Sequence, residues 1–219
     1  QGWTALHEVK WTRRPNLGFN NPPPLVTGSM RDVEFVRALA SHGADLNRRM
    51  RKEPNNSYRN VLNRIGSTPF LLAAKAADIE MMRLLVELGA DPLLPNEDGT
   101  TPLMVAAGVG IWAVGESPGT NEEALAAVQY ALELGGEVTT VDDNGDTALH
   151  GAIIRSSEPL VRFLLAEGAD IDAINEKGWT PLRIARGVFY SNTGKRWPEM
   201  DVLLHALGAD ETLVTGADN

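Results

Sequence analysis

Two short stretches of the sequence resemble patterns that are found in catalytic or metal-binding sites. G-E-S-P-G at 115–119 matches the G-x-S-x-G pattern, in which a serine between a strand and a helix acts as a nucleophile. Pro118 and the loop-forming residues around it favour neither a strand before the serine nor a helix directly after it. D-D-N-G-D at 142–146 spaces oxygen-bearing side chains as in a calcium loop, but its glycine is misplaced and the distal glutamate is absent. We therefore predict neither a catalytic serine nor a calcium site.

The other candidates for metal binding or catalysis are the histidines, because the sequence has no cysteine. His7, His42, His150 and His205 are far apart, and none belongs to an H-E-x-x-H pair. No glycine-rich phosphate loop follows an expected strand. We therefore predict a protein that is not an enzyme and that has no metal or other cofactor. The lack of cysteine fits the cytoplasm and a secreted or periplasmic compartment alike, so the localisation stays open.

The net charge of −9 conceals an asymmetry along the chain. Residues 1–65 hold eleven Lys or Arg against five Asp or Glu, and residues 66–219 hold nine against twenty-four, so the two parts carry +6 and −15. The acidic part would repel nucleic acid and anionic lipid, and we expect neither as a partner. The basic N-terminal part could attract an acidic partner. No apolar stretch is long enough to span a bilayer, so we expect no membrane insertion.

The sequence contains an internal repeat. Five similar openings, G-W-T-A-L-H-E-V, G-S-T-P-F-L-L-A-A, G-T-T-P-L-M-V-A-A, G-D-T-A-L-H-G-A-I and G-W-T-P-L-R-I-A, begin at Gly2, Gly66, Gly99, Gly145 and Gly178. Each has a matching close, four of them G-A-D and one G-G-E, whose glycines are Gly43, Gly89, Gly135, Gly168 and Gly208. The second and fourth units are both 33 residues long, with 23 residues from the opening to the closing glycine. Such a fixed period indicates a stack of similar units.

The recurring residues predict two helices in each unit. A threonine follows each opening glycine at the place of an N-cap, and in three units proline comes next, at the first helical position. Apolar residues at helical spacing, such as Ile79, Met82 and Leu85, then predict a second helix. The closing glycines stand where a helix ends in a left-handed residue. Asp98-Gly99 and Asn144-Gly145 predict tight turns into the next unit.

These units resemble the ankyrin repeat, whose T-P-L-H-x-A opening and G-A-D close they match over nearly the whole chain. The histidine of that opening is present as His7 and His150, and Leu71, Met104 and Arg183 replace it elsewhere. The resemblance implies an all-α solenoid of about five helix-turn-helix units with hairpin loops. We expect one domain, 1–219, with units at about 2–65, 66–98, 99–144, 145–177 and 178–212 and a polar tail at 213–219.

Three units carry an insertion between their two helices. The insertions add 18, 13 and 7 residues to the first, third and fifth units. Aromatic residues lie in or beside them, namely Trp11, Phe19, Trp112, Phe189, Tyr190 and Trp197. Decorated units are about 20 Å apart and a 13-residue loop reaches about 20 Å, so we expect the loops to meet along one edge of the stack. The rings could bind a partner or fold back and seal the stack, and both interpretations stay open.

A further 13 residues extend the hairpin after the first unit. The basic residues of this hairpin are Arg48, Arg49, Arg51, Lys52, Arg59 and Arg64, and Glu53 is the acidic residue among them. Hairpins line the binding groove of ankyrin proteins, so the resemblance makes this basic hairpin a candidate contact for a carboxylate-rich partner. The alternative is a solvated arm, or one that neutralises acidic residues of the next unit.

The resemblance implies a protein–protein interaction or scaffold module, which binds another protein, or another domain of the same protein, through the repeat surface and the decorated loops. The alternative function is binding of a small molecule or glycan by the aromatic loops, which would require rings that face inward around a concavity. The long insertions are similar to those of bacterial ankyrin proteins. They favour a part of a longer bacterial protein. Because Gly2 opens a unit with no polar capping unit before it, we also expect further repeats, another domain or a self-contact to cover that end.

Overall fold

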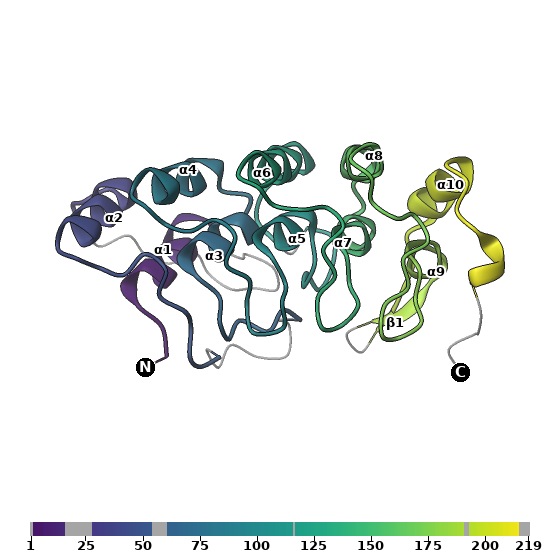
Figure 1. Ribbon diagram of the computed structural model, residues 1–219, viewed down its shortest axis with the longest axis horizontal. Coiled ribbons are helices and arrows are strands. Elements are labelled where there is room, and N and C mark those ends of the chain that lie inside the picture. The colour runs from purple at the N-terminus through teal and green to yellow at the C-terminus, as the bar shows by residue number, and fades with distance from the viewer. Residues whose placement is uncertain (1, 16–27, 54–60, 116, 191–192, 215–219) are drawn as a thin grey trace.

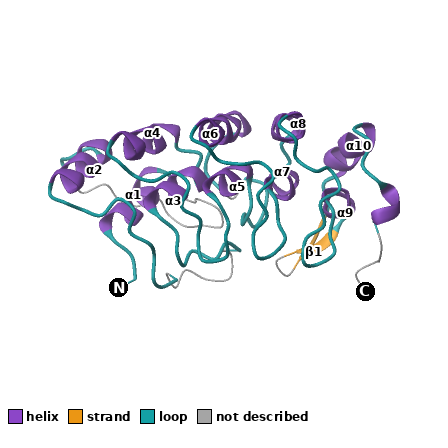
Figure 2. Ribbon diagram, viewed as in Figure 1, coloured by secondary structure: helices purple, strands orange, loops and turns teal. Residues whose placement is uncertain are grey.

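The computed structural model describes residues 2–15, 28–53, 61–115, 117–190 and 193–214, which form an elongated stack of helix pairs (Figure 1). The pairs are α1 (Ala5–Arg13) with α2 (Asp32–Ser41), α3 (Pro69–Lys75) with α4 (Ile79–Glu87), α5 (Pro102–Ala107) with α6 (Asn121–Glu133), α7 (Ala148–Arg155) with α8 (Glu158–Ala166), and α9 (Pro181–Arg186) with α10 (Pro198–Ala206). Helix and loop make up nearly all of the described chain (Figure 2). The predicted all-α solenoid is confirmed.

The helices form two rows (Figure 1). The first helices of the pairs, α1, α3, α5, α7 and α9, lie in one row, and their partners lie in the other. The hairpin loops project from the side of the first helices, away from the second row. Each first helix contacts the first helix of the next unit, so every internal unit buries apolar surface against its neighbours.

The repeated residues begin and end the helices as predicted. Thr68, for example, caps α3 by accepting a hydrogen bond from the Leu71 N–H at 3.2 Å. Thr101 and Thr180 cap α5 and α9 in the same way. All five closing glycines adopt the left-handed backbone in which a side chain would be strained, with φ between +82° and +100°.

The two histidines of the openings link neighbouring units. The Nδ1 atom of His150 accepts from the Thr147 N–H at 3.1 Å, so Nε2 carries the proton and donates to the Trp179 carbonyl of the next unit at 3.1 Å. His7 repeats this arrangement with Thr4 and, in the next unit, the Ser67 carbonyl. Both rings are buried, and burial lowers the pKa of each below the usual histidine value.

The core runs the length of the stack. Its largest fully buried side chains are Phe70, Leu71, Met82, Leu85, Leu103, Met104, Ile111, Leu149, Ile153, Leu160, Leu164 and Leu182. Leu71 and Met104 stand where other units have histidine, so the replacement adds apolar contacts at these two places. No helix in the described ranges is long and apolar enough to cross a membrane.

One element was not predicted from the sequence. The insertion of the fifth unit contains an antiparallel strand pair, β1 (Val188–Tyr190) and β2 (Thr193–Lys195), in which Val188 is opposite Lys195. The pair lies beside α9 on the side of the hairpins (Figures 1 and 2). It holds this insertion against the stack.

Candidate partner-binding surface

The hairpins form a row of fingers along the stack, and the structure describes four of them at residues 45–53 with 61–66, 91–100, 137–146 and 170–179, which we call the first to fourth fingers. Backbone hydrogen bonds join each fingertip to the one before it. Glu97 N donates to the Ile65 carbonyl at 2.9 Å, Asp143 N to the Asp98 carbonyl at 2.8 Å, and Glu176 N to the Asn144 carbonyl at 2.9 Å. This ladder fixes the spacing of the fingertips, so the row is a preorganised surface.

A polar side chain at the same place in each finger holds the turn. In the fourth finger, Asn175 Oδ1 accepts from the N–H groups of Lys177 and Trp179 at 3.0 Å each, and its Nδ2 donates to Asp146 Oδ1 at 2.8 Å. Asn63 and Asn96 have this place in the first and second fingers. The fingers are therefore tied by side chains as well as by backbone.

Asp142 has the same place in the third finger, where a carboxylate replaces the amide. It accepts hydrogen bonds from Thr100 Oγ1 at 2.8 Å, from Asn144 N at 2.9 Å and from Asp146 N at 3.0 Å. Burial raises the pKa of Asp142 above the usual aspartate value, although the Thr100 hydrogen bond opposes this shift. The finger row thus holds a buried carboxylate that costs stability when it is charged.

The tips of the second, third and fourth fingers are acidic and partly apolar. Glu97, Asp143 and Glu176 are exposed at equivalent positions, beside the backbone ladder. Val141 and Ile174 are also exposed, at 57% and 55%, and stand at equivalent positions of neighbouring fingers. These two side chains offer apolar area on neighbouring fingers.

The first finger is basic. Arg48, Arg51 and Lys52 are exposed, and within the described parts of the chain none of them has an ion-pair partner. Arg49 differs, because its Nη1 donates to the Pro95 carbonyl at 2.7 Å and so braces the first finger against the second. A groove of about 580 Å³ is lined by Arg48, Arg49 and Arg51 and also by Glu97 of the second finger. The candidate Arg59 lies outside the described residues.

Arg64 is the exception within the basic hairpin. Its side chain is 4% exposed and pairs with Glu53, with Nη2 and Oε2 2.8 Å apart. It therefore serves the structure of the finger, whereas Arg48, Arg49, Arg51 and Lys52 are exposed.

Two of the aromatic candidates are buried against other units. Trp197 is 5% exposed, and its Nε1 donates to the Ile154 carbonyl of the fourth unit at 3.1 Å. Tyr190 is 7% exposed, and its hydroxyl donates to the Ile111 carbonyl in the third unit's insertion at 2.9 Å. The third and fifth insertions therefore meet across the fourth unit, which has no insertion. Residues 16–27 of the first insertion lie outside the described residues, so the expected meeting of all three insertions stays a prediction. These two rings pack inside the protein between units, which favours the sealing interpretation for them.

The remaining aromatic candidates are less buried. Trp112 lies under the ammonium group of Lys195, 4.1 Å from the ring centroid, and Trp11 lies 3.9 Å from the ammonium group of Lys10. Both rings are half-buried, whereas Phe189 on β1 is 61% exposed. Phe19 lies outside the described residues.

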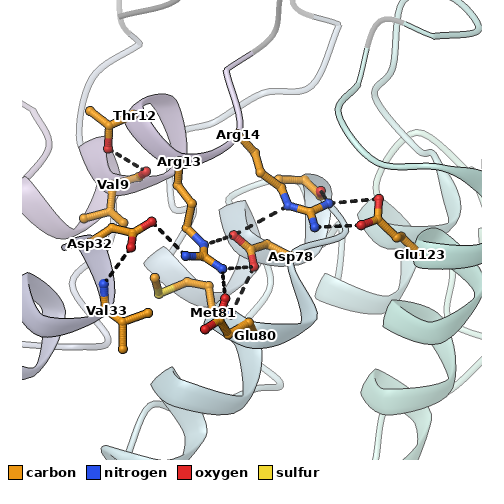
Figure 3. Close-up of polar contacts among 11 residues, drawn as sticks. Val9, Thr12, Arg13, Arg14, Asp32, Val33, Asp78, Glu80, Met81 and Glu123 are labelled. Carbon is orange, nitrogen blue, oxygen red and sulfur yellow. Dashed lines mark hydrogen bonds and ion pairs between the residues drawn. The ribbon is translucent and has the colours of Figure 1, made fainter. Parts of the chain in front are cut away.

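The sequence did not reveal a cluster of ion pairs at the base of the first insertion (Figure 3). Arg13 Nη1 binds Asp32 at 2.7 Å, and its Nε and Nη2 bind the two oxygens of Asp78 at 2.5 and 3.2 Å. Arg13 also pairs with Glu80, in the first turn of α4. Burial alone would lower the pKa of Arg13, but its hydrogen bonds to these carboxylates raise it. Two features of the sequence could have indicated this cluster. They are the adjacent basic residues 13 and 14 and the acidic residues in the first turns of the second helices.

Arg14 extends this cluster to the third unit. Its Nη2 and Nη1 donate to Glu123 Oε1 and Oε2, at 2.8 and 3.1 Å (Figure 3). Glu123 also caps α6 by accepting from the Thr120 N–H at 2.9 Å. Arg13 and Arg14 thus clamp the first three units together at the edge that carries the insertions.

The stretches that resemble a nucleophile motif and a calcium loop lie in bends and turns of the repeat structure. Ser117 is buried in a bend, and α6 begins only at Asn121. No strand precedes it within the described residues. The described part of the chain contains no group of three or more histidine or acidic side chains able to hold a metal ion. Asp142 and Asp146, from the stretch that resembles a calcium loop, hold the finger turns.

Comparison with known proteins agrees with the repeat geometry. A family model described as ankyrin repeats (3 copies) matches residues 119–187, and a model of the single ankyrin repeat matches residues 65–97. The chain is an ankyrin-repeat protein. Members of this family are generally binding modules, and their repeats make contacts with other proteins.

Relatives of this ankyrin-repeat protein are found among animal proteins. The nuclear factor NF-kappa-B p105 subunit of Gallus gallus is 29% identical over 182 residues, which cover 82% of this chain and 16% of the relative. The B-cell lymphoma 3 protein homolog of Mus musculus is 35% identical over 124 residues, 56% of this chain and 25% of the relative. The RelA-associated inhibitor of Mus musculus is 39% identical over 61 residues, which cover 28% of this chain and 7% of the relative.

The chain thus spans a quarter or less of the length of each of these three relatives. The resemblance of the insertions to those of bacterial ankyrin proteins gains no support from these animal relatives and stays a prediction.

Proposed function

We propose that this ankyrin-repeat protein binds a partner protein that lies along the four fingers, with an acidic segment of the partner on the basic first finger. The observation that carries the proposal is the change of charge along one rigid row. Arg48, Arg51 and Lys52 are exposed on the first finger, and Glu97 and Asp143 are exposed on the next two. A partner with acidic and basic segments in matching order would be held in one orientation.

The apolar side chains of the row and the nature of the relatives support a protein as the partner. Val141 and Ile174 offer aliphatic surface between the charged tips. The mouse RelA-associated inhibitor is, by its name, a protein that associates with another protein. Among the aromatic candidates, Phe189 has the exposure needed for contact with a partner, and Trp112 is accessible in part.

Small-molecule binding by the aromatic loops has less support. The groove beside the first finger has no aromatic residue in its lining. A cavity of about 150 Å³ under α7 is lined by the single aromatic Tyr190, together with the carboxylates of Asp98, Asp142 and Asp146. The volume is below the range of about 300 to 1,000 Å³ that is usual for ligand pockets. The buried rings of Tyr190 and Trp197 face other repeat units.

The proposal is tested with a fluorescently labelled, end-blocked peptide of glutamates as the probe. Fluorescence anisotropy should show binding that weakens between 50 and 200 mM salt, because the contacts are between exposed charges. The double variant Arg48→Ala/Arg51→Ala should lose about tenfold in affinity, since two such contacts together contribute about 1.4 kcal/mol. The matched control is Arg83→Ala/Arg162→Ala, which removes two exposed arginines from the second helices. Equal losses in the two double variants, or no binding by the wild type, would refute the proposed role of the first finger.

A further inference from the structure

Arg155 is a buried arginine at an unusual place in the repeat. It is the last residue of α7, eight positions after the N-cap Thr147, and is 5% exposed. The residues eight positions after the N-caps of α3, α5 and α9 are Ala76, Val109 and Val188, all of them buried. A guanidinium group therefore replaces a small apolar side chain that three other units bury.

One edge of this guanidinium has no partner. The Nε and Nη2 atoms of Arg155 are buried and make no hydrogen bond within the described chain. Their N–H groups are parallel, and this edge of an arginine accepts both oxygens of a carboxylate or two oxygens of a phosphate. Arg13 shows the arrangement in the same protein, where Nε and Nη2 bind the two oxygens of Asp78 (Figure 3).

The acidic group whose charge acts on Arg155 does not satisfy it. The charge of Glu123, in the first turn of α6, acts on the guanidinium, but Arg14 and the Thr120 N–H occupy both oxygens of Glu123. Burial lowers the pKa of Arg155, against the opposing influence of Glu123. Leaving a buried charge without a hydrogen-bond partner is among the costliest arrangements in a folded protein. A group that binds it would therefore be favoured strongly.

We infer that Arg155 is the centre of a binding site for an oxyanion with two adjacent oxygens, a carboxylate or a phosphate. The site lies at the loop end of α7, between the first turn of α6 and the end of α5 at Gly108, where an added Cβ would come within 3.1 Å of Arg155 Cβ. The fingers are at the opposite end of the first helices, so this site is separate from the proposed partner surface and does not depend on it.

Acetate and inorganic phosphate are the first probes, with chloride at equal ionic strength as the reference. At about five times its dissociation constant, a binding anion should raise the melting temperature by about 2 to 4 °C. It should also shift the Arg155 Nε–H resonance in a saturable way in the NMR spectrum of the wild type. Arg155→Met should abolish the anion-specific rise in melting temperature. Arg183→Met is the matched control, because Arg183 is also buried on a first helix but donates to the Gly187 carbonyl, and this variant should keep the response.

A second pair of probes distinguishes the source of the oxyanion. An end-blocked Gly-Glu-Gly peptide carries a side-chain carboxylate, and Gly-Gln-Gly is its neutral counterpart. Binding of acetate or phosphate means that a free anion suffices, whereas binding of the glutamate peptide alone means that the carboxylate comes from a protein side chain. Equal effects of all probes and chloride on the wild type would overturn the inference, as would an anion response that persists in Arg155→Met. The NMR measurement on the wild type stays decisive if that variant does not fold.

Discussion

Replacing Trp197 by alanine should destabilise the protein far more than it weakens partner binding. A buried tryptophan removes about 150 to 250 Å² from water, which corresponds to about 4 to 6 kcal/mol at about 25 cal/mol per Å². Trp197 is 5% exposed and also donates to the Ile154 carbonyl. Truncations of buried aromatic rings cost about 3 to 5 kcal/mol, and we expect Trp197→Ala in this range. Trp197→Phe keeps most of the ring and should lose about 1 to 2 kcal/mol, mainly because Ile154 loses its donor.

The assay is urea unfolding followed by far-ultraviolet circular dichroism, since tryptophan fluorescence changes with the substitution itself. Phe189→Ala is the control, because Phe189 is 61% exposed and its loss should change the free energy of unfolding by about 0.5 kcal/mol or less. Binding of the glutamate peptide, normalised to folded protein, should stay the same in Trp197→Ala. A loss of stability below about 1 kcal/mol would refute the sealing role, as would a loss of binding with intact stability.

Three further predictions concern buried charges. Burial lowers the pKa of His150 below the usual value of about 6.5. The free energy of unfolding should therefore be highest above about pH 6.5 and should fall as the pH drops below it, because the unfolded state then binds a proton that the folded state does not. His150→Met, which places a methionine where the third unit has Met104, should reduce the difference between denaturation curves at pH 7.5 and 5. The pKa of Asp142 is raised, so ionisation of its side chain lowers the free energy of unfolding as the pH rises through that pKa. The stabilisation of Asp142→Asn relative to the wild type should therefore grow from pH 4 to 7 and not stay constant. Arg13→Gln leaves the carboxylate of Asp78, which is 4% exposed, without its main partner and should lower the free energy of unfolding by about 3 kcal/mol. Arg162→Ala, which removes an exposed ion pair, should lower it by less than about 0.5 kcal/mol, and equal losses in the two variants would contradict the clamp.

The fold was predictable because the signals repeat. Capping threonines such as Thr68 and closing glycines such as Gly89 act over three or four residues, and their mechanical roles do not depend on distant contacts. Leu85→Ala and Leu164→Ala should cost about 2 to 4 kcal/mol each, because both side chains lie between helices of the repeated core.

The insertions were harder to predict because their conformation depends on contacts between units. The three-residue strands β1 and β2 are too short to give a periodic signal, and the Arg13 clamp joins residues 65 positions apart in the sequence. The burial of Trp197 had one usable signal. Trp197 lies eleven residues before its closing glycine, Gly208. Asp78 and Ser157 lie the same number of residues before the closing glycines of their own units, and all three residues are buried. Its aromatic type left binding and sealing open, and its register in the repeat indicated the core.

The position of a bound partner on the stack distinguishes the proposed finger surface from the surface of the second helices. A photo-crosslinking amino acid is introduced one site at a time at Arg51, Val141 and Ile174 on the fingers, and at Arg83, Gln129 and Arg162 on the second helices; all six side chains are exposed. Each variant is produced in cells that make the protein naturally, irradiated, and its crosslinked products are identified by mass spectrometry. We expect one partner protein to be captured from all three finger positions and from none of the helix positions. Capture from the helix positions instead of the fingers would contradict this expectation.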